Sequence, residues 1–428
     1  MSIAIVKGRA IMLTLIRALL VLAFITPLSQ AGNWPAWRGP NRNGHSPEKE
    51  APLQWDKTKN VLWKIALPDE GNSTPIVWDD RIFLTQATDK GRTRALFCLS
   101  RKDGKTIWKK EVIHREKEST HRTNPFCSAS PVIDGERVIV SFGSAGMHCY
   151  DFDGKKQWSV DVGKLEHIWG NASSPILYKD LAILWCGPGE RQFLLAVDKK
   201  SGEEKWRYKV PGGASGLGNG KRNWVGSWST PIVANVNGRD ELILSVPRFL
   251  KGIDPNKGTE LWSCAGLGPL VYTSPIISKD NIVVACSGYG GAALAVKAGG
   301  NGDVTKNRLW HHTKRNPQRI GSGVVIGDYA YLRSDTGLTH RFDLKTGEDT
   351  WKERAGRGKG WGSAVVVGDR IYVSTERGGT VVLAVGPKFK VLATNNIGEL
   401  MRSSPVIADG QILLRTYKHL WCIGERSD

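Results

Sequence analysis

Residues 196–206 read Ala-Val-Asp-Lys-Lys-Ser-Gly-Glu-Glu-Lys-Trp. A short apolar run ends at Asp198, a turn through Gly202 follows, and a second run carries Trp206. Glycine suits tight turns that need a positive φ, and aspartate side chains bond to nearby turn backbone. The stretch therefore predicts two antiparallel strands joined by a tight turn, with a large aromatic residue on the second strand.

The same unit recurs along the whole chain. Each copy opens with a small hydroxyl residue, usually followed by proline, and most copies close with Asp, a Gly turn and Trp. The closing tryptophans are 41 to 56 residues apart, and Phe389 takes this place in the seventh copy. A repeat of this length with several short strands is typical of propeller blades. The eight openings begin at Ser73, Ser130, Ser173, Ser229, Thr273, Ser322, Ser363 and Ser403.

Four strands are expected in each unit. In the third unit they cover residues 174–177, 181–185, 192–198 and 204–210, which are rich in β-branched and aromatic residues and bounded by Gly, Asp and Lys.

The last unit has only three expected strands before the chain ends, and residues 61–65 match the missing fourth. The sequence thus predicts an all-β fold: a single eight-bladed β-propeller with four antiparallel strands per blade, closed by the N-terminal strand pairing in the last blade. Two separate propellers or a β-helix are the alternatives.

The N-terminal 31 residues have the pattern of an export signal. Basic residues precede the apolar run 18–25, and a small-x-small pattern ends at Ala31. The run is too short to span a bilayer, and no later stretch is long and apolar enough. We expect no transmembrane segment after signal removal and a periplasmic or extracellular location, with an uncleaved anchor as the alternative. The expected organisation is a signal peptide at 1–31, a leader at 32–60, the propeller at 61–424 and a tail at 425–428.

Composition adds two expectations. The chain of 428 residues has a net charge of +19, which favours anionic partners such as acidic polymers, although charge spread over the surface is an equally simple interpretation. The seven cysteines show no metal-ligand spacing. Cys98, Cys149 and Cys422 occupy a position filled by alanine in other units, which favours packing over pairing. Whether Cys127, Cys186, Cys264 and Cys286 are paired stays open.

Residues 196–206, 254–262 and 343–351 resemble the tryptophan-docking motif of PQQ-like (quinoprotein-type) propeller repeats, and the resemblance covers about residues 60–424. The chain is also similar to the propeller lipoproteins of the outer-membrane β-barrel assembly machinery, which have no catalytic activity. In this family the tryptophan packs against the neighbouring blade. The resemblance implies that structural role for Trp63, Trp108, Trp158, Trp206, Trp262, Trp310 and Trp351.

Two functions follow from the resemblance. The first is an exported, non-catalytic binding or scaffold module for a protein partner or an anionic ligand such as an acidic polymer or carbohydrate, monomeric, without cofactor or metal and without specific nucleic-acid binding. The alternative is a PQQ-dependent oxidoreductase that holds its quinone with calcium. That class often carries a disulfide between adjacent cysteines, and this sequence has no adjacent pair and no full set of calcium ligands. A carbohydrate-cleaving enzyme would need a pair of catalytic acids, and no such pair is evident in the long loops.

Propeller geometry places the long loops 111–128, 161–172, 209–228 and 265–272 on one face. Basic residues beside aromatic rings in these loops fit an acidic or sugar-bearing ligand, unless the rings only plug the channel. The hydroxyls that open each unit are expected to bond backbone. The expected ligand-binding residues are His121, Arg122, Asn124, Trp169, Asn171, Arg222, Asn223, Trp224, Trp228, Trp361 and Arg402.

Overall fold

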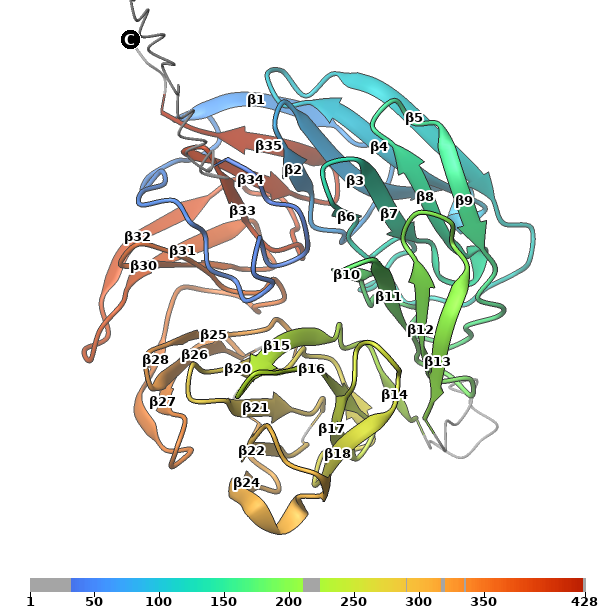
Figure 1. Cartoon of the computed structure of the whole chain (residues 1–428). Helices are drawn as coiled ribbons and strands as arrows, with labels where there is room; N and C mark the ends of the chain where they lie inside the picture. The colour runs from blue at the N-terminus through green and yellow to red at the C-terminus, as the bar shows by residue number, and fades with distance from the viewer. Residues whose placement is uncertain (1–31, 211–223, 290, 317–319, 335, 426–428) are drawn as a thin grey trace, which may run out of the picture. The chain divides into compact units, whose positions relative to one another are not determined.

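The computed structural model describes residues 32–210, 224–289, 291–316, 320–334 and 336–425. The expected signal and part of the loop 209–228 lie outside this description. Eight antiparallel sheets follow one another around a ring, as Figure 1 shows from a viewpoint along the ring's axis. The predicted eight-bladed propeller is confirmed. In the described part of the chain, no helix has the length and apolar character needed to cross a membrane.

The first four blades follow the chain in order, each from its inner to its outer strand. Blade 1 has β2 (Ile76–Trp78), β3 (Arg81–Thr88), β4 (Thr93–Ser100) and β5 (Thr106–Ile113). Blade 2 has β6 (Val132–Ile133), β7 (Arg137–Ser141), β8 (Met147–Asp151) and β9 (Lys156–Val160). Blade 3 has β10 (Ile176–Tyr178), β11 (Leu181–Cys186), β12 (Phe193–Asp198) and β13 (Glu204–Lys209). Blade 4 has β15 (Ile232–Val236), β16 (Arg239–Val246), β17 (Phe249–Ile253), β18 (Glu260–Ala265) and an added fifth strand, β23 (Gly302–Asp303).

The remaining blades complete the ring. Blade 5 has β20 (Ile276–Ile277), β21 (Ile282–Cys286), β22 (Ala293–Lys297) and β24 (Arg308–His312). Blade 6 has β25 (Val324–Ile326), β26 (Tyr329–Arg333), β27 (Leu338–Asp343) and β28 (Asp349–Arg354). Blade 7 has β29 (Val365–Val367), β30 (Arg370–Ser374), β31 (Gly379–Ala384) and β32 (Val391–Asn396). Blade 8 has β33 (Val406–Ala408), β34 (Gln411–Arg415), β35 (His419–Ile423) and β1 (Val61–Ala66). A small parallel pair, β14 (Gly226–Ser227) with β19 (Leu270–Val271), and the 3-10 turns η1 (Asp89–Gly91), η2 (Gly143–Ala145) and η3 (Thr305–Asn307) lie in the connections.

The ring closes through the pairing of the two ends of the propeller. Strand β1 runs antiparallel to β35, with Trp63 opposite Cys422 and Ile65 opposite Leu420. In Figure 1 the blue strand β1 accordingly lies beside the red strand β35. The predicted closing strand, residues 61–65, is one residue shorter than the observed one.

The inner strand of blade 3 starts slightly later than predicted. In blade 3 the strand begins at Ile176 and not at residue 174. Proline 175 has no N–H to give to a ladder, and the N–H of Ser174 donates to the Thr230 hydroxyl of the next blade. The chain therefore bonds across blades before it enters its own sheet.

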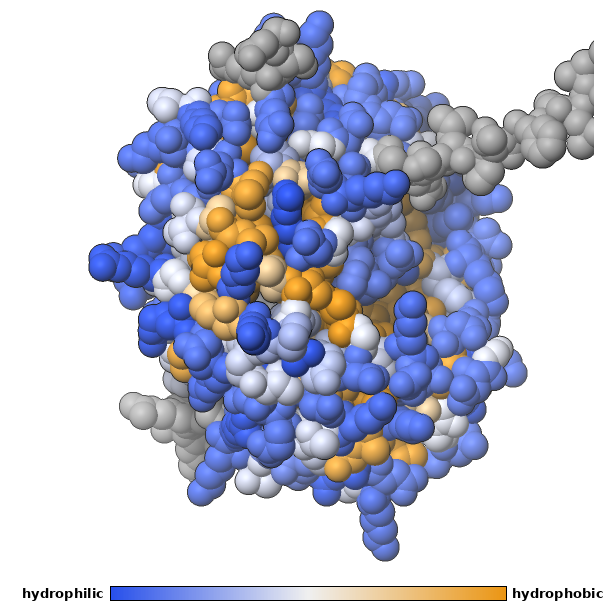
Figure 2. Space-filling model, turned by 90° about the vertical axis from the view of Figure 1, so that its left-hand side faces the viewer, coloured by the Kyte–Doolittle hydropathy of each residue, from blue (hydrophilic) through white to orange (hydrophobic). Residues whose placement is uncertain are grey.

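The core lies between neighbouring blades. One apolar cluster, for example, joins Leu194 and Trp206 of blade 3 to Leu242 and Leu244 of blade 4. Burying such area is the main favourable contribution to folding. Figure 2 shows one side of the molecule, where hydrophilic residues cover most of the surface and apolar residues gather in a patch near the middle.

All seven cysteines are buried, and Cys98, Cys127, Cys149, Cys186, Cys264 and Cys422 are free thiols. Of the four cysteines whose pairing was open, Cys127, Cys186 and Cys264 are therefore unpaired. Burial raises the pKa of Cys127 to about 12, and it raises the pKa values of the Cys98, Cys149 and Cys422 thiols similarly. A thiol that stays protonated is a poor nucleophile, so we interpret these residues as packing groups.

The leader crosses one face of the ring and bonds to several blades. The N–H of Ile133 in blade 2 donates to the Pro35 carbonyl, and the N–H of Ser46 donates to the Val366 carbonyl in blade 7. Farther along, the Tyr372 hydroxyl donates to the Ala51 carbonyl. The leader thus ties together blades that are distant in sequence.

Candidate functional site

The docking tryptophans bond from one blade to the next. The indole N–H donates to a backbone carbonyl of the following blade at N–O distances of 2.8–3.1 Å in five cases. A turn glycine with a positive φ leaves room for each ring: a Cβ on Gly202 would lie 2.8 Å from the Trp158 indole. The five donor–acceptor pairs are Trp63 with Arg101, Trp108 with Phe152, Trp158 with Lys199, Trp206 with Pro255 and Trp310 with Leu344.

Trp351 makes a longer bond of this kind, 3.5 Å to the Gly386 carbonyl. Trp262 departs from the pattern, because the Trp262 indole N–H donates to the buried Glu241 carboxylate of its own blade at 2.7 Å. Blade 5 has an insertion at residues 298–307, which supplies strand β23 beside Trp262 in place of the usual turn. Trp262 still packs against the apolar residues of blade 5.

A belt of eight hydroxyls joins all the blades around the axis. At each step a backbone N–H donates to the hydroxyl oxygen of the next blade, at 2.8–3.2 Å. Of the predicted opening hydroxyls, Ser130, Ser322 and Ser363 belong to this belt, and in the other blades the belt hydroxyl is on the following residue. The Ser73 and Ser403 hydroxyls instead donate to backbone carbonyls of their own blades, as expected for local backbone bonding. The members of the belt are Thr74, Ser130, Ser174, Thr230, Ser274, Ser322, Ser363 and Ser404.

A cavity of about 260 Å³ lies within this belt, and all eight blades contribute to its lining. We call it the axial cavity. Trp37 of the leader lines it together with six belt residues. Six of the predicted ligand-binding residues meet here: His121, Asn124, Trp169, Trp228, Trp361 and Arg402.

Four aromatic side chains form one wall of the axial cavity. Trp169 lies 5.8 Å from Trp228 and 5.9 Å from Tyr289, measured between ring centroids. Tyr272 lies 5.1 Å from Trp228 and 5.6 Å from Tyr289. Tyr289 is 55% exposed and marks the open edge of the wall. Such a surface stacks against a flat apolar face of a ligand.

The opposite side of the axial cavity is polar. Arg402 lies 4.8 Å above the Trp361 ring and forms an ion pair with Glu376. Its positive charge is therefore largely balanced by the protein itself. The pKa of His121 is lowered by burial and by the nearby Arg122 and Arg402, which favours a neutral imidazole at pH 7.

Three buried polar atoms of the lining have no hydrogen-bond partner among the described residues. They are the indole Nε1 of Trp361, the Nε of Arg402 and the Oδ1 of Asn72. Buried polar groups are nearly always paired, so orphan atoms beside a cavity indicate groups that a ligand or water satisfies. Two donors and one acceptor match the hydroxyls of a ligand, because a hydroxyl both donates and accepts.

Several predicted residues lie elsewhere. Asn171 turns away from the axial cavity toward Glu118, and Trp224 packs on Trp169 at 4.8 Å. Arg122 lines a neighbouring groove, and its carbonyl accepts a bond from Tyr417. Arg222 and Asn223 lie outside the described residues.

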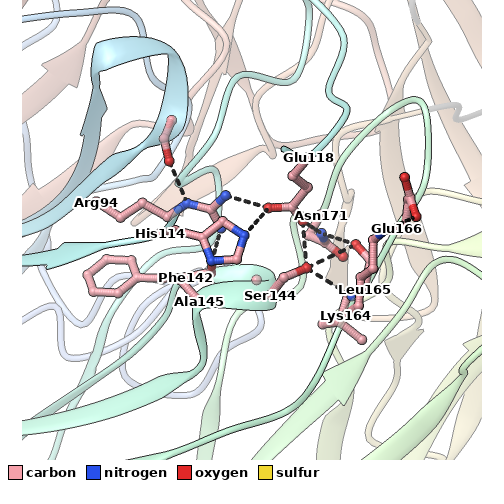
Figure 3. Close-up of polar contacts among 12 residues, drawn as sticks. Arg94, His114, Glu118, Phe142, Ser144, Ala145, Lys164, Leu165, Glu166 and Asn171 are labelled. Atoms are coloured by element: carbon pink, nitrogen blue, oxygen red, sulfur yellow. Dashed lines mark hydrogen bonds and ion pairs between the residues drawn. The ribbon is translucent and has the colours of Figure 1, made fainter. Parts of the chain in front are cut away.

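A buried network positions the loop that carries His121 and Asn124 (Figure 3). The Glu118 carboxylate pairs with Arg94 and accepts bonds from Ser144 at 2.8 Å and Asn171 at 3.1 Å. The Asn124 amide donates to the Trp169 carbonyl at 2.6 Å, which links this loop to the aromatic wall.

The sequence interpretation missed Asn72, Tyr272 and Tyr289. The first two occupy the position just before the opening hydroxyl of a unit, as Trp228 and Arg402 do. The repeat therefore carried a signal for them, namely a large side chain at the residue that faces the axis. Tyr289 follows β21, in a connection without such a pattern.

No three histidine, cysteine, aspartate or glutamate side chains come together as a potential metal site within the described ranges.

The comparisons with known proteins concern both family and fold. The family model described as outer membrane protein assembly factor BamB matches residues 58–244, 250–353 and 335–424. No curated protein matches the chain.

Several solved structures share the fold. BamB from Moraxella catarrhalis is similar at a TM-score of 0.60 and 14% identity, over 86% of this chain and 98% of that one. The quinohemoprotein alcohol dehydrogenase from Comamonas testosteroni has a TM-score of 0.68 and 11% identity, over 93% of this chain and 82% of that one. The quinohemoprotein alcohol dehydrogenase from Pseudomonas putida has a TM-score of 0.64 and 11% identity, over 93% of this chain and 81% of that one. At these identities the likeness concerns the fold alone.

Proposed function

Because the chain belongs to the family of the outer membrane protein assembly factor BamB, we propose that it is a non-catalytic binding module. Its axial cavity takes a carbohydrate segment of an anionic polymer of the cell envelope or its surroundings. The proposal includes export, for which residues 1–31 carry the sequence pattern.

One observation carries the proposal: the axial cavity combines an aromatic wall with orphan donors and an orphan acceptor. A sugar ring has an apolar C–H face that fits Trp169 and Tyr272, and hydroxyls at its edge that fit Trp361, Arg402 and Asn72. The net charge of +19 draws an acidic polymer toward the protein over longer distances, and salt weakens this attraction.

The lining does not support hydrolysis of the sugar. Glycosidases generally use two carboxyl groups that flank the bond they cleave. The described residues of the axial cavity include neither aspartate nor glutamate. Binding without cleavage is therefore the function that this chemistry favours.

The alternative function is quinone-dependent oxidation, which the two quinohemoprotein alcohol dehydrogenases of similar fold suggest. Calcium prefers carboxylate and carbonyl oxygens, and the described lining supplies no carboxylate. Its one arginine is already paired with Glu376. The residues present do not fit a calcium-bound, anionic quinone.

The test is calorimetric titration with an oligogalacturonate and, for comparison, a neutral cello-oligosaccharide. Trp361→Phe keeps the ring and removes the orphan donor, so we expect about fivefold weaker binding, the equivalent of one hydrogen bond. Trp351→Phe is the matched control, because its indole N–H lies in a docking contact and we expect unchanged affinity.

Two results would overturn the proposal. One is the absence of saturable binding of either saccharide. The other is stoichiometric binding of PQQ with calcium, accompanied by oxidation of an alcohol.

A protein partner is a second candidate, favoured by the family description as an assembly factor. Such a partner would contact the face formed by the long loops. A defined peptide that competes with the oligosaccharide for wild-type protein, but not for a variant altered on that face, would support it.

A further inference from the structure

A second cavity, of about 210 Å³, lies between the leader and the inner strands of the ring. We call it the basal cavity. Its polar lining consists of Arg38, Asn41, Arg42, Asn43 and His45, all from the leader, and its other walls are apolar residues near β15, β20 and β25. No described residue lines both the basal cavity and the axial cavity, although the leader and the inner strands run past both.

The two arginines are only partly satisfied. The Nη2 group of Arg38 donates to the carbonyls of Asn43 and Gly323, and the Nη2 group of Arg42 donates 2.7 Å to the Leu177 carbonyl. The Nε atom of each guanidinium is buried and has no partner among the described residues. A buried N–H without an acceptor costs free energy, so such a group indicates a missing partner.

Three other buried arginines of this protein are bonded differently from Arg38 and Arg42. Among the described residues, Arg333 and Arg415 also have a buried Nε without a partner and no carboxylate partner, yet each uses both of its Nη groups on neutral oxygen atoms. The difference therefore lies in the Nη groups and not in the Nε atoms. Arg94 is paired with Glu118. Within the described part of the chain, Arg38 and Arg42 each form hydrogen bonds through Nη2 only, and both side chains line the same cavity.

The charge of this cavity is not balanced by its lining. Burial lowers the pKa of Arg38 to about 9 and that of Arg42 to about 10, and none of the described residues that line the cavity carries a carboxylate. Arg38 and Lys279 also lower the pKa of His45, after the larger effect of burial. Two guanidinium groups remain charged at neutral pH under these conditions, and buried charge is costly without a counter-charge.

We infer that the basal cavity is an oxyanion site, in which Arg38 and Arg42 hold a phosphate, sulfate or carboxylate group. Guanidinium groups bind such anions through charge-assisted hydrogen bonds in a fixed fork geometry. The ligand would supply acceptors for the two orphan Nε atoms and would balance the charge between the leader and the ring. This inference is independent of the proposed carbohydrate binding.

The test is isothermal titration of the full chain with inorganic phosphate at constant ionic strength. Arg42→Gln is the informative variant, because the Arg42 side chain makes only one bond among the described residues, to a backbone carbonyl, so its loss should disturb the fold little. Arg38 is less suitable, because its side chain ties the leader to blade 6. Arg92→Gln is the matched control: it removes the same charge from a side chain that is 64% exposed. We expect saturable binding to the wild type and to Arg92→Gln, and binding at least about tenfold weaker to Arg42→Gln.

Sulfate and acetate, titrated in the same way, distinguish a tetrahedral anion from a carboxylate. If Arg42→Gln does not fold, Arg42→Lys takes its place in the titration. In addition, phosphate must then raise the thermal unfolding midpoint of the wild type more than chloride does at equal ionic strength. Equal affinity of Arg42→Gln and Arg92→Gln would overturn the inference, as would the absence of saturable binding of all three oxyanions. Trp361→Phe is expected to bind phosphate like the wild type, which separates this test from that of the axial cavity.

Discussion

Glu118 illustrates how single buried charges organise this protein. Its carboxylate is 3% exposed and meets Arg94, whose side chain is 2% exposed, together with Ser144 and Asn171. These partners come from different blades and loops. The carboxylate therefore fixes the loop that carries His121 and Asn124 toward the axial cavity.

We expect Glu118→Ala to lower the free energy of unfolding by about 3–5 kcal/mol, because Arg94 would remain as a buried charge without its partner. Urea unfolding followed by tryptophan fluorescence measures the change. Glu136→Ala removes a carboxylate that is 73% exposed, and we expect a loss below about 0.5 kcal/mol. Equal losses in the two variants would show that the buried pair has no special weight.

At this scale the sequence predicted part of the site. Trp169, Trp228, Trp361 and Arg402 could be found because large or basic residues in loops near the axis are conspicuous in a propeller repeat. The orientation of Asn171 could not be found, because its partner Glu118 lies 53 residues earlier and the two meet only in the folded protein.

Among the elements, the contact between β1 and β35 is held by Glu399. The Lys64 ammonium of β1 lies 3.1 Å from the Glu399 carboxylate, and His419 and Trp421 of β35 also contact it. Burial alone would raise the pKa of Glu399, but hydrogen bonds from Thr416, His419 and Lys64 lower it to about 2.

The folded protein therefore binds this proton more weakly than the unfolded chain, whose glutamates have a pKa near 4.5. The stability that Glu399 contributes is present above about pH 4.5 and is lost as the pH falls toward 2. We expect the difference in unfolding free energy between wild type and Glu399→Gln to shrink steadily from pH 6 to pH 3. Glu203→Gln, at a 69% exposed position, should show no such trend.

The elements were mostly predictable because each blade repeats the same pattern of hydroxyl, apolar runs and turn. Strand β23 was not predicted. It belongs to an insertion in blade 5 that has no counterpart in other units, and its pairing with β18 is parallel and only two residues long.

Over the whole molecule, the hydroxyl belt joins the eight blades in one circle. We expect Ser174→Ala to lower the unfolding free energy by about 1–3 kcal/mol, since the N–H of Ser130 would lose its acceptor inside the protein. Ser245→Ala is the matched control, because that buried hydroxyl oxygen has no partner among the residues that the structure describes, and its removal should cost almost nothing. Thermal or urea unfolding of the two variants compares them directly, and a similar loss in both would contradict a role for the belt.

The pairing of β1 with β35 also sets the order of events in folding. Val61 and Ile423 are more than 300 residues apart, so the first strand has no partner until almost the entire chain has been synthesised. Contacts of such long range form slowly, and an unpaired edge invites association with other chains. A chain interrupted shortly before residue 419 would retain seven complete blades and two open edges. We expect such a fragment to aggregate, whereas a chain that includes β35 can pair it with β1 and close the ring.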